Sequence, residues 1–178
     1  ISGNREKVKI GADFIQYAEA SSELQGKWTA FRGEERDNIH KGSIPLIDKF
    51  PENGPEILWS MELGEGHAAP AIYNGNVYIL DYIEEEKADA LRCFSLETGE
   101  ELWRRSYKVH IKRNHGISRT IPAVNEKYIV SLGPKAQVMC CDRKTGEMLW
   151  GLDLVKDFQA EIPFWYTGQC PMIIDNVA

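Results

Sequence analysis

The feature that most restricts the fold of this chain is a segment around tryptophan that occurs three times. The three copies are PEILWSMEL (55–63), GEELWRRSY (99–107) and GEMLWGLDL (146–154). Their tryptophans stand at positions 59, 103 and 150, so the copies are 44 and 47 residues apart. Self-similarity at a period of this length indicates a repeat architecture, in which each unit is one supersecondary structure.

A second feature recurs in step with the first. After each tryptophan segment and a variable stretch comes a proline that opens an apolar run: PAIYNGNVYIL (70–80), PAVNEKYIVSL (122–132) and PMIIDNVA (171–178). Two independent features that recur in the same order make a chance resemblance a poor explanation. The chain is therefore predicted to consist of repeats that begin near each of these prolines.

Each repeat is predicted to start with a β-hairpin. In the first repeat, apolar stretches at 71–73 and 77–80 flank the dipeptide Asn74-Gly75. Asn-Gly between two such stretches is a strong signal for a two-residue hairpin turn, because both residues tolerate positive φ. Asn125-Glu126 and Asp175-Asn176 stand at the same place in the second and third repeats.

Two more strands complete the predicted unit. A third apolar run at 91–96 ends at the turn Thr98-Gly99, after which Leu102-Trp103 opens a fourth strand. The second repeat has Thr145-Gly146 at the same place, and both glycines provide the positive φ that a tight turn requires. Four short antiparallel strands in about 45 residues are typical of one blade of a β-propeller. The predicted fold class is therefore all-β.

The repeated tryptophans are predicted to be structural. A single four-stranded blade cannot bury both of its faces, so blades pack face to face and need a large side chain between them. A tryptophan buries about 150–250 Å², which at about 25 cal/mol/Å² stabilises the fold by several kcal/mol. We therefore expect Trp59, Trp103 and Trp150 to fill the seams between blades rather than bind a ligand.

These segments resemble the pattern A-x-D-x-x-T-G-x-x-x-W, the tryptophan-docking motif of the pyrroloquinoline quinone (PQQ)-like propellers. One copy is formed by Cys140, Asp142, Thr145, Gly146 and Trp150, and a second by Cys93, Ser95, Thr98, Gly99 and Trp103. Cysteine replaces alanine in both copies, and serine replaces aspartate in one. WTAFRG (28–33) followed by GPEILW (54–59) also resembles the opening segment of secreted PQQ-like repeat proteins. The resemblance covers residues 26–178.

The resemblance implies a ring of roughly eight blades, of which this chain would carry an incomplete part. Residues 25–178 are predicted to hold an opening strand, two full blade units and the start of a third. The opening strand, around 28–31, is expected to belong to a closing blade that the chain lacks. Residues 1–24 are predicted to be an N-terminal tail or linker, with a short helix within KVKIGADFIQYAEASSEL (7–24).

Candidate binding residues come from the segments that lead into the first strand of each blade. In propellers these segments lie at one mouth of the central channel. The predicted mouth residues are His67, Arg119, Gln169, Trp165 and Tyr166. The resemblance implies that Arg119 would pair with a PQQ carboxylate, because its planar guanidinium suits bidentate contacts, and that His67 would be a polar ligand or proton acceptor. Ordinary polar lining of the channel is the alternative.

Trp165 and Tyr166 would suit stacking on a sugar or quinone, and packing is their alternative role. Residues 108–119 (KVHIKRNHGISR) are basic within an acidic chain. They are either an anion or acidic-substrate site or a solvated loop between blades.

The cysteines are predicted to be small core residues. Some quinoprotein dehydrogenases stack their cofactor on a disulfide between adjacent cysteines, and Cys140-Cys141 is such a pair. Neighbouring residues of a strand point to opposite faces, however, so this bridge would need a distorted peptide. The four cysteines also show no C-x-x-C or His-paired spacing, so no metal site is predicted.

Charge and hydropathy narrow the function classes. The net charge of −6 and the lack of a basic stripe argue against nucleic acid as a partner, and no apolar run approaches the roughly 20 residues of a membrane-spanning helix. The first hypothesis is an exported, non-catalytic binding or scaffold propeller without a cofactor, which binds a protein, small molecule or sugar at the channel mouth. The alternatives are a PQQ- and calcium-dependent alcohol or sugar dehydrogenase and a carbohydrate-binding or carbohydrate-acting propeller. The resemblance implies the periplasm or cell envelope.

Overall fold

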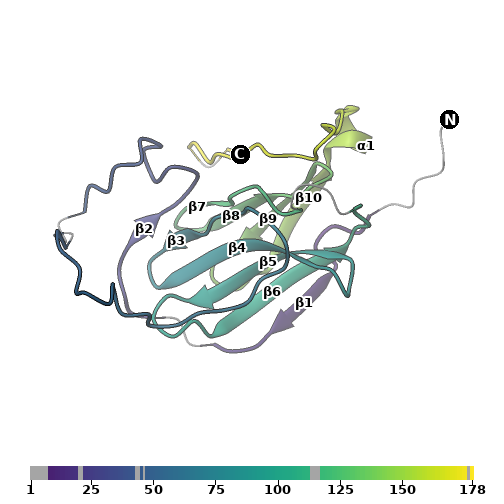
Figure 1. The fold of residues 1–178 in the computed structure, drawn as a ribbon. Helices are drawn as coiled ribbons and strands as arrows, with labels where there is room; N and C mark the ends of the chain where they lie inside the picture. Colours follow the sequence, from purple (N-terminus) through teal and green to yellow (C-terminus); the bar gives the residue numbers. More distant parts are fainter. Residues whose placement is uncertain (1–7, 20–21, 43–44, 46, 113–116, 176) are drawn as a thin grey trace.

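Two antiparallel sheets, one for each complete repeat, form the framework of the protein in a computed structural model (Figure 1). The structure describes residues 8–19, 22–42, 45, 47–112, 117–175, 177 and 178. The first sheet has the strand order β1-β6-β5-β4-β3-β2 and the second β10-β9-β8-β7. Nearly all regular structure is therefore strand, as the all-β prediction requires.

Four strands of the first sheet come from the first repeat: β3 (Ala71–Tyr73), β4 (Asn76–Ile83), β5 (Ala88–Ser95) and β6 (Glu101–Lys108). The second repeat forms β7 (Ala123–Val124), β8 (Tyr128–Leu132), β9 (Gln137–Asp142) and β10 (Met148–Asp153). Each strand pairs antiparallel with the next in the chain, which confirms the predicted four-stranded units. A short helix, α1 (Leu154–Phe158), follows β10.

The predicted turns have the expected backbone. Asn74 and Gly75 both have positive φ, 37° and 80°, between β3 and β4. Gly99 and Gly146 have φ of 72° and 68° and donate their N–H groups to Ser95 and Asp142 at 2.9 and 3.0 Å.

The two Thr-Gly turns differ in how strongly a side chain supports them. In the second, one oxygen of Asp142 accepts hydrogen bonds from Lys144 N, Thr145 N and the Thr145 hydroxyl. In the first, Ser95 Oγ accepts a single bond from Thr98 N at 3.3 Å. The aspartate of the motif therefore holds its turn by three bonds, and the serine that replaces it provides one.

Each turn glycine lies against the tryptophan of the preceding repeat. A Cβ atom added to Gly99 would stand 2.7 Å from the ring of Trp59, and one added to Gly146 would stand 2.8 Å from the ring of Trp103. A side chain at either position would collide with the indole, so only glycine allows this contact. The motif thus links neighbouring repeats, because the tryptophan comes from one and the glycine from the next.

The main core lies between the two sheets. Tyr78, Leu91 and Trp103 of the first sheet pack against Ile129 and Met139 of the second, and all five side chains are almost fully buried. The opposite face of the first sheet packs around Phe94 and is covered by the segment that carries Trp59. The first sheet is therefore covered on both faces.

The N-terminal region departs from the predictions. Instead of a short helix, Asp13–Gln16 forms β1, which pairs with β6 at the edge of the first sheet. The pairing satisfies backbone groups of an edge strand that would otherwise be open to other chains. β2 (Lys27–Trp28) pairs with β3 at the other edge, so this part of the expected opening strand joins the first blade rather than a closing blade.

In the described residues of the third repeat, strand pairing is limited to one isolated bridge. Ile174 and Val177 form an isolated antiparallel bridge, and Asp175 between them has φ of 49°. The predicted turn also includes Asn176, which lies outside the described residues.

Candidate functional site

The segments that lead into the first two inner strands lie side by side. We call residues 65–68, 117–120 and 165–169 the lead-in segments. Gly66 and Ser118 form a parallel β-bridge, and His67 N donates to Ser118 O at 2.6 Å. Ile117 N donates to Glu65 O at 3.4 Å. Backbone contacts thus hold the first two lead-in segments parallel to each other.

The third lead-in segment lies next to the second. The Arg119 guanidinium donates to the backbone oxygen of Trp165, and Ile121 N donates to Cys170 Sγ at 3.3 Å. Thr167 binds the turn between β8 and β9, because its N–H donates to Pro134 O at 3.0 Å and its hydroxyl donates to Gly133 O at 2.5 Å. The three lead-in segments therefore form one row.

The structure gives the five predicted mouth residues different surroundings. The Tyr166 hydroxyl accepts from Lys112 N at 3.0 Å and donates to Lys112 O at 3.1 Å, so it ties the third segment to the chain after β6. His67 and Gln169 are exposed, and Gln169 Oε1 accepts from Gly168 N at 3.2 Å. Arg119 and Trp165 are in contact, whereas among the described residues no side-chain hydrogen bond joins Gln169 to the other four.

An exposed aromatic pair stands beside these residues. Phe164 is 81% exposed and Trp165 44%, and their rings meet edge to face with centroids 4.5 Å apart. Phe164 was not among the predicted site residues, although it belongs to the same PFWYTGQ stretch as Trp165. Side chains this apolar and this accessible form a surface on which a flat ligand can stack.

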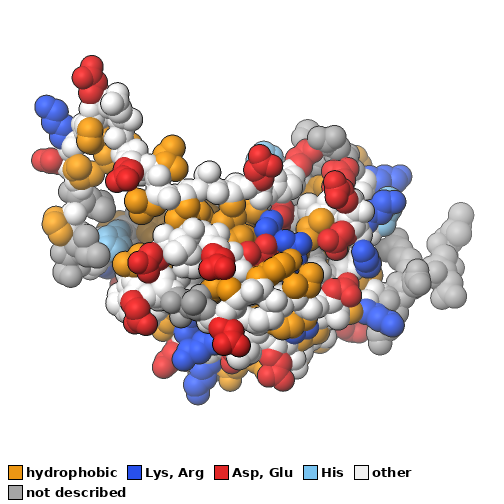
Figure 2. Space-filling model, turned by 90° about the horizontal axis from the view of Figure 1, so that it is seen from below, with side chains coloured by type: hydrophobic (Ala, Val, Ile, Leu, Met, Phe, Trp, Pro, Cys, Tyr) orange, Lys and Arg blue, Asp and Glu red, His pale blue; other side chains and the backbone are white. Residues whose placement is uncertain are grey.

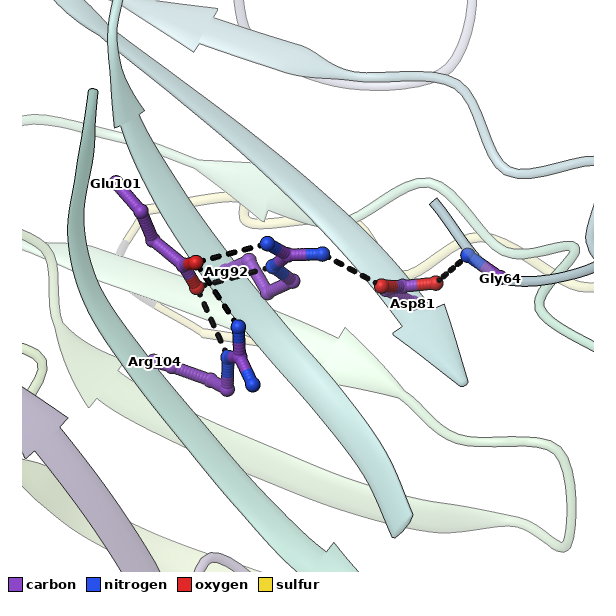
Figure 3. A network of polar contacts seen from close by, with 5 residues as sticks. All are labelled: Gly64, Asp81, Arg92, Glu101 and Arg104. Carbon is purple, nitrogen blue, oxygen red and sulfur yellow. Dashed lines mark hydrogen bonds and ion pairs between the residues drawn. The ribbon is translucent and has the colours of Figure 1, made fainter. Parts of the chain in front are cut away.

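A charged network holds the start of the first lead-in segment (Figure 3). Arg92 donates to both oxygens of Glu101 at 3.0 and 2.8 Å and to Asp81 at 2.7 Å. Arg104 also donates to both oxygens of Glu101, at 2.9 Å each. The second oxygen of Asp81 accepts from Gly64 N at 2.7 Å, one residue before the segment that carries His67.

This network is positioned to orient the chain rather than to transfer protons. Burial works to raise the pKa of Glu101, but the hydrogen bonds from Arg104 and Arg92 outweigh it and the pKa is lowered. Burial also works to lower the pKa of Arg92, yet its bonds to Glu101 and Asp81 raise it. A Cβ on Gly64 would stand 2.2 Å from Tyr82 O, so the close approach requires glycine. The role of Gly64 could not be predicted from the sequence, because no local pattern shows that Asp81 lies opposite.

A buried acid lies between the sheets. Asp89 accepts a hydrogen bond from the Tyr107 hydroxyl at 2.8 Å, and its other oxygen has no hydrogen-bond partner among the described residues. Burial raises the pKa of Asp89 to about 7, helped by the nearby Asp81 charge and opposed by the Tyr107 bond. A Cβ on Gly133 of the second sheet would stand 2.0 Å from the Tyr107 hydroxyl. With Asp89 only 2% exposed, this acid is part of the seam rather than of an open site.

The cysteines are free thiols. Cys93, Cys140 and Cys141 are buried and Cys170 is half-buried. Burial raises the pKa of Cys140 to about 11 and that of Cys141 to about 12, so both remain protonated near neutral pH.

The lead-in segments by themselves do not match a PQQ and calcium site. They contain one carboxylate, Glu65, whereas calcium takes six to eight oxygen ligands. Nowhere in the described ranges do three His, Cys, Asp or Glu side chains meet in a way that would hold a metal ion. Among the same residues, no helix has the length and apolar character that a membrane-spanning segment needs.

Comparison with known proteins gives one family. Residues 86–172 match the PQQ-like repeat model that is described as outer membrane protein assembly factor BamB. A europium-containing methanol dehydrogenase structure is 16% identical, with a TM-score of 0.45 over 67% of this chain and 21% of its own. The quinohemoprotein alcohol dehydrogenase ADHIIG from Pseudomonas putida HK5 is 21% identical, with a TM-score of 0.35 over 49% of this chain and 13% of its own. This chain therefore spans about a fifth or less of either protein, and no curated protein sequence matches it significantly.

Proposed function

The chain belongs to the PQQ-like repeat family, and from this premise we propose that it is a segment of an exported β-propeller with a non-catalytic binding or scaffold role. Its ligand surface is formed by the three lead-in segments, with His67, Arg119, Trp165, Tyr166 and Gln169 as the binding residues. The tryptophans of the repeats dock neighbouring blades, so they support this surface and do not belong to it.

The observation that carries the proposal is the continuous row of lead-in segments. The Gly66–Ser118 bridge joins the first to the second, and the contact of Arg119 with the Trp165 backbone joins the second to the third. Each segment leads into a different repeat, so the row exists only because the repeats stack in register. A surface built from segments fixed by backbone hydrogen bonds needs little reorganisation when it binds, which favours affinity.

A protein is the partner that we favour, in the periplasm or cell envelope. The matching family model is described as an assembly factor of the outer membrane, which points to protein contacts rather than to turnover of a substrate. The exposed Phe164–Trp165 pair is the type of side chain that anchors protein interfaces.

Site-specific photo-crosslinking in cells tests this proposal. A photo-reactive amino acid at position 67 or 165 is expected to capture the same envelope protein, and a matched probe at the exposed Lys127 is expected to capture none of it. Addition of PQQ and Ca²⁺ to the purified protein is the second arm. Saturable binding of PQQ, followed by its absorbance, would overturn the non-catalytic proposal, and so would the absence of a captured protein at both probe positions.

Carbohydrate binding is the second candidate, favoured by the accessible rings of Phe164 and Trp165. Aromatic faces exposed to this degree suit the apolar faces of sugars. A glycan array probed with the purified protein and with Trp165→Ala separates the two proposals. Sugar binding that is lost in the variant supports this candidate, whereas an array without signal removes it.

A further inference from the structure

A cavity at the end of the molecule near α1 gathers positive charge. Its volume is about 990 Å³. The residues that line it come from five places: the chain before β1, the turn between β4 and β5, the end of β6, the turn between β8 and β9, and the region around α1. Five of the twelve lysines line it: Lys9, Lys87, Lys108, Lys135 and Lys156. Several blue side chains are visible at the same, right-hand end of the molecule in Figure 2.

Hydrogen bonds place two of these ammonium groups at the cavity wall. Lys108 Nζ donates to Glu86 O at 3.0 Å and Lys135 Nζ donates to His110 O at 2.5 Å, and all four residues line the cavity. A lysine ammonium has three donors, so the Lys108 ammonium can donate further hydrogen bonds beside the one to Glu86 O. The remaining donors are therefore held at a fixed place along the wall.

Acidic groups offset only part of this charge, because the cavity has five lysines and three carboxylates. Three carboxylates line the cavity, and one of them, Asp153, caps α1 by accepting from Lys156 N at 3.2 Å. The ion pairs of the described residues do not include Lys9, Lys87 or Lys108. In a chain with a net charge of −6, the cavity is thus a local region of positive charge that attracts anions.

Five apolar side chains also contribute to the wall. Val8, Ala12, Val109, Val155 and Ile162 line the cavity between the lysines. Gln137 is 3% exposed and lies in the same wall, and its amide oxygen has no hydrogen-bond partner among the described residues. A cavity of this volume that combines apolar side chains with convergent polar groups is typical of a small-molecule site.

We propose that this cavity binds an amphiphilic organic anion, with a carboxylate or phosphate head on the lysines and an apolar body against the valine and isoleucine side chains. The site is separate from the lead-in segments and does not depend on their proposed function. It also gives a role to part of the basic stretch 108–119, because Lys108, Val109 and His110 form one side of it. Residues 113–116 of that stretch lie outside the described residues.

Calorimetric titration of the whole chain tests the proposal. Dodecanoate and dodecyl phosphate, each below its micelle concentration, represent the two head groups. Dodecyltrimethylammonium carries the same apolar body with a positive head, and inorganic phosphate carries the head without the body. We expect saturable binding of at least one anionic amphiphile, and no binding of the other two probes. Binding should weaken as the salt concentration rises, because salt screens the lysine charges.

Paired variants locate the site. Lys87→Gln with Lys108→Gln should weaken binding of the anionic amphiphile about tenfold, the effect expected when two exposed charge contacts are lost. Lys49→Gln with Lys127→Gln removes the same charge from exposed positions outside the cavity and should leave the affinity unchanged. Circular dichroism melts confirm that both double variants fold.

The proposal is overturned in three ways. The cationic amphiphile binds as tightly as the anions, or both double variants bind equally well, or neither anionic amphiphile binds the folded protein.

Discussion

Trp103 and Trp150 stand at the same place in successive repeats, yet their surroundings are opposite. Trp103 is 1% exposed between the two sheets, with its ring against Gly146, whereas Trp150 in β10 is 40% exposed. Trp59, the first of the three, is half-buried against Gly99. The repeat therefore provides the tryptophan, whereas the burial of its ring depends on whether the glycine turn of the following repeat covers it.

The less buried of the Trp59 and Trp103 indoles, that of Trp59, is the one that donates a hydrogen bond. Trp59 Nε1 donates to Leu96 O at 2.9 Å, whereas Trp103 Nε1 has no partner among the described residues. The carbonyl equivalent to that of Leu96 is Arg143 O, which accepts from the Tyr78 hydroxyl at 3.1 Å. The better-buried tryptophan therefore stabilises the fold through apolar area alone.

The largest expected effect is that of Trp103→Ala. Loss of a fully buried tryptophan leaves a cavity between the sheets and should lower the free energy of unfolding by about 3–5 kcal/mol. Urea denaturation followed by circular dichroism measures it. A loss no greater than that of Trp150→Ala would show that the seam between the sheets is not the main source of stability.

The second largest effect concerns how the free energy of unfolding depends on pH, through the buried Asp89 in the same seam. Asp89 has a folded pKa of about 7 against an ordinary value of 3.8, because it is buried beside Tyr107. Between about pH 4 and pH 7 the folded state therefore holds a proton that the unfolded state releases. The contribution of Asp89 to the free energy of unfolding is complete below about pH 4 and is lost as the pH rises through 7. One pKa unit corresponds to about 1.4 kcal/mol, so the loss is at most about 4 kcal/mol.

Denaturation of the wild type and of Asp89→Asn at pH 5 and pH 8 checks this prediction. The wild type should be less stable at pH 8 than at pH 5, and the amide, which does not titrate, should remove most of the difference. An equal pH dependence in both proteins would mean that Asp89 is ionised in the seam.

The smallest expected effect is that of Trp150→Ala. A side chain that is 40% exposed in this structure loses little contact area, so the free energy of unfolding should fall by less than about 1 kcal/mol. The same urea titration compares it directly with Trp103→Ala. A loss above about 3 kcal/mol would show that another surface covers Trp150 in solution.

One part of the candidate site could be predicted from the sequence, and another part could not. The spacing of His67 and Arg119 before their prolines predicted lead-in segments at one place, and the structure joins those segments by backbone bonds. The spacing could not show that the Tyr166 hydroxyl bonds to the Lys112 backbone or that Gly64 N donates to the Asp81 carboxylate. Such contacts depend on how loops of different repeats meet, for which no local periodicity exists.

Local sequence patterns are enough to predict the repeat, its four strands and its glycine turns. Hairpin dipeptides, alternating apolar residues and positive-φ glycines act over a few residues, and their preferences are visible without any partner. Three features became visible in the folded protein alone. Trp103 is the buried tryptophan, Asp13–Gln16 is an edge strand rather than a helix, and five lysines from distant segments share one cavity. Burial, edge pairing and converging charge arise where segments far apart in the sequence meet in the fold. A single segment therefore does not show them.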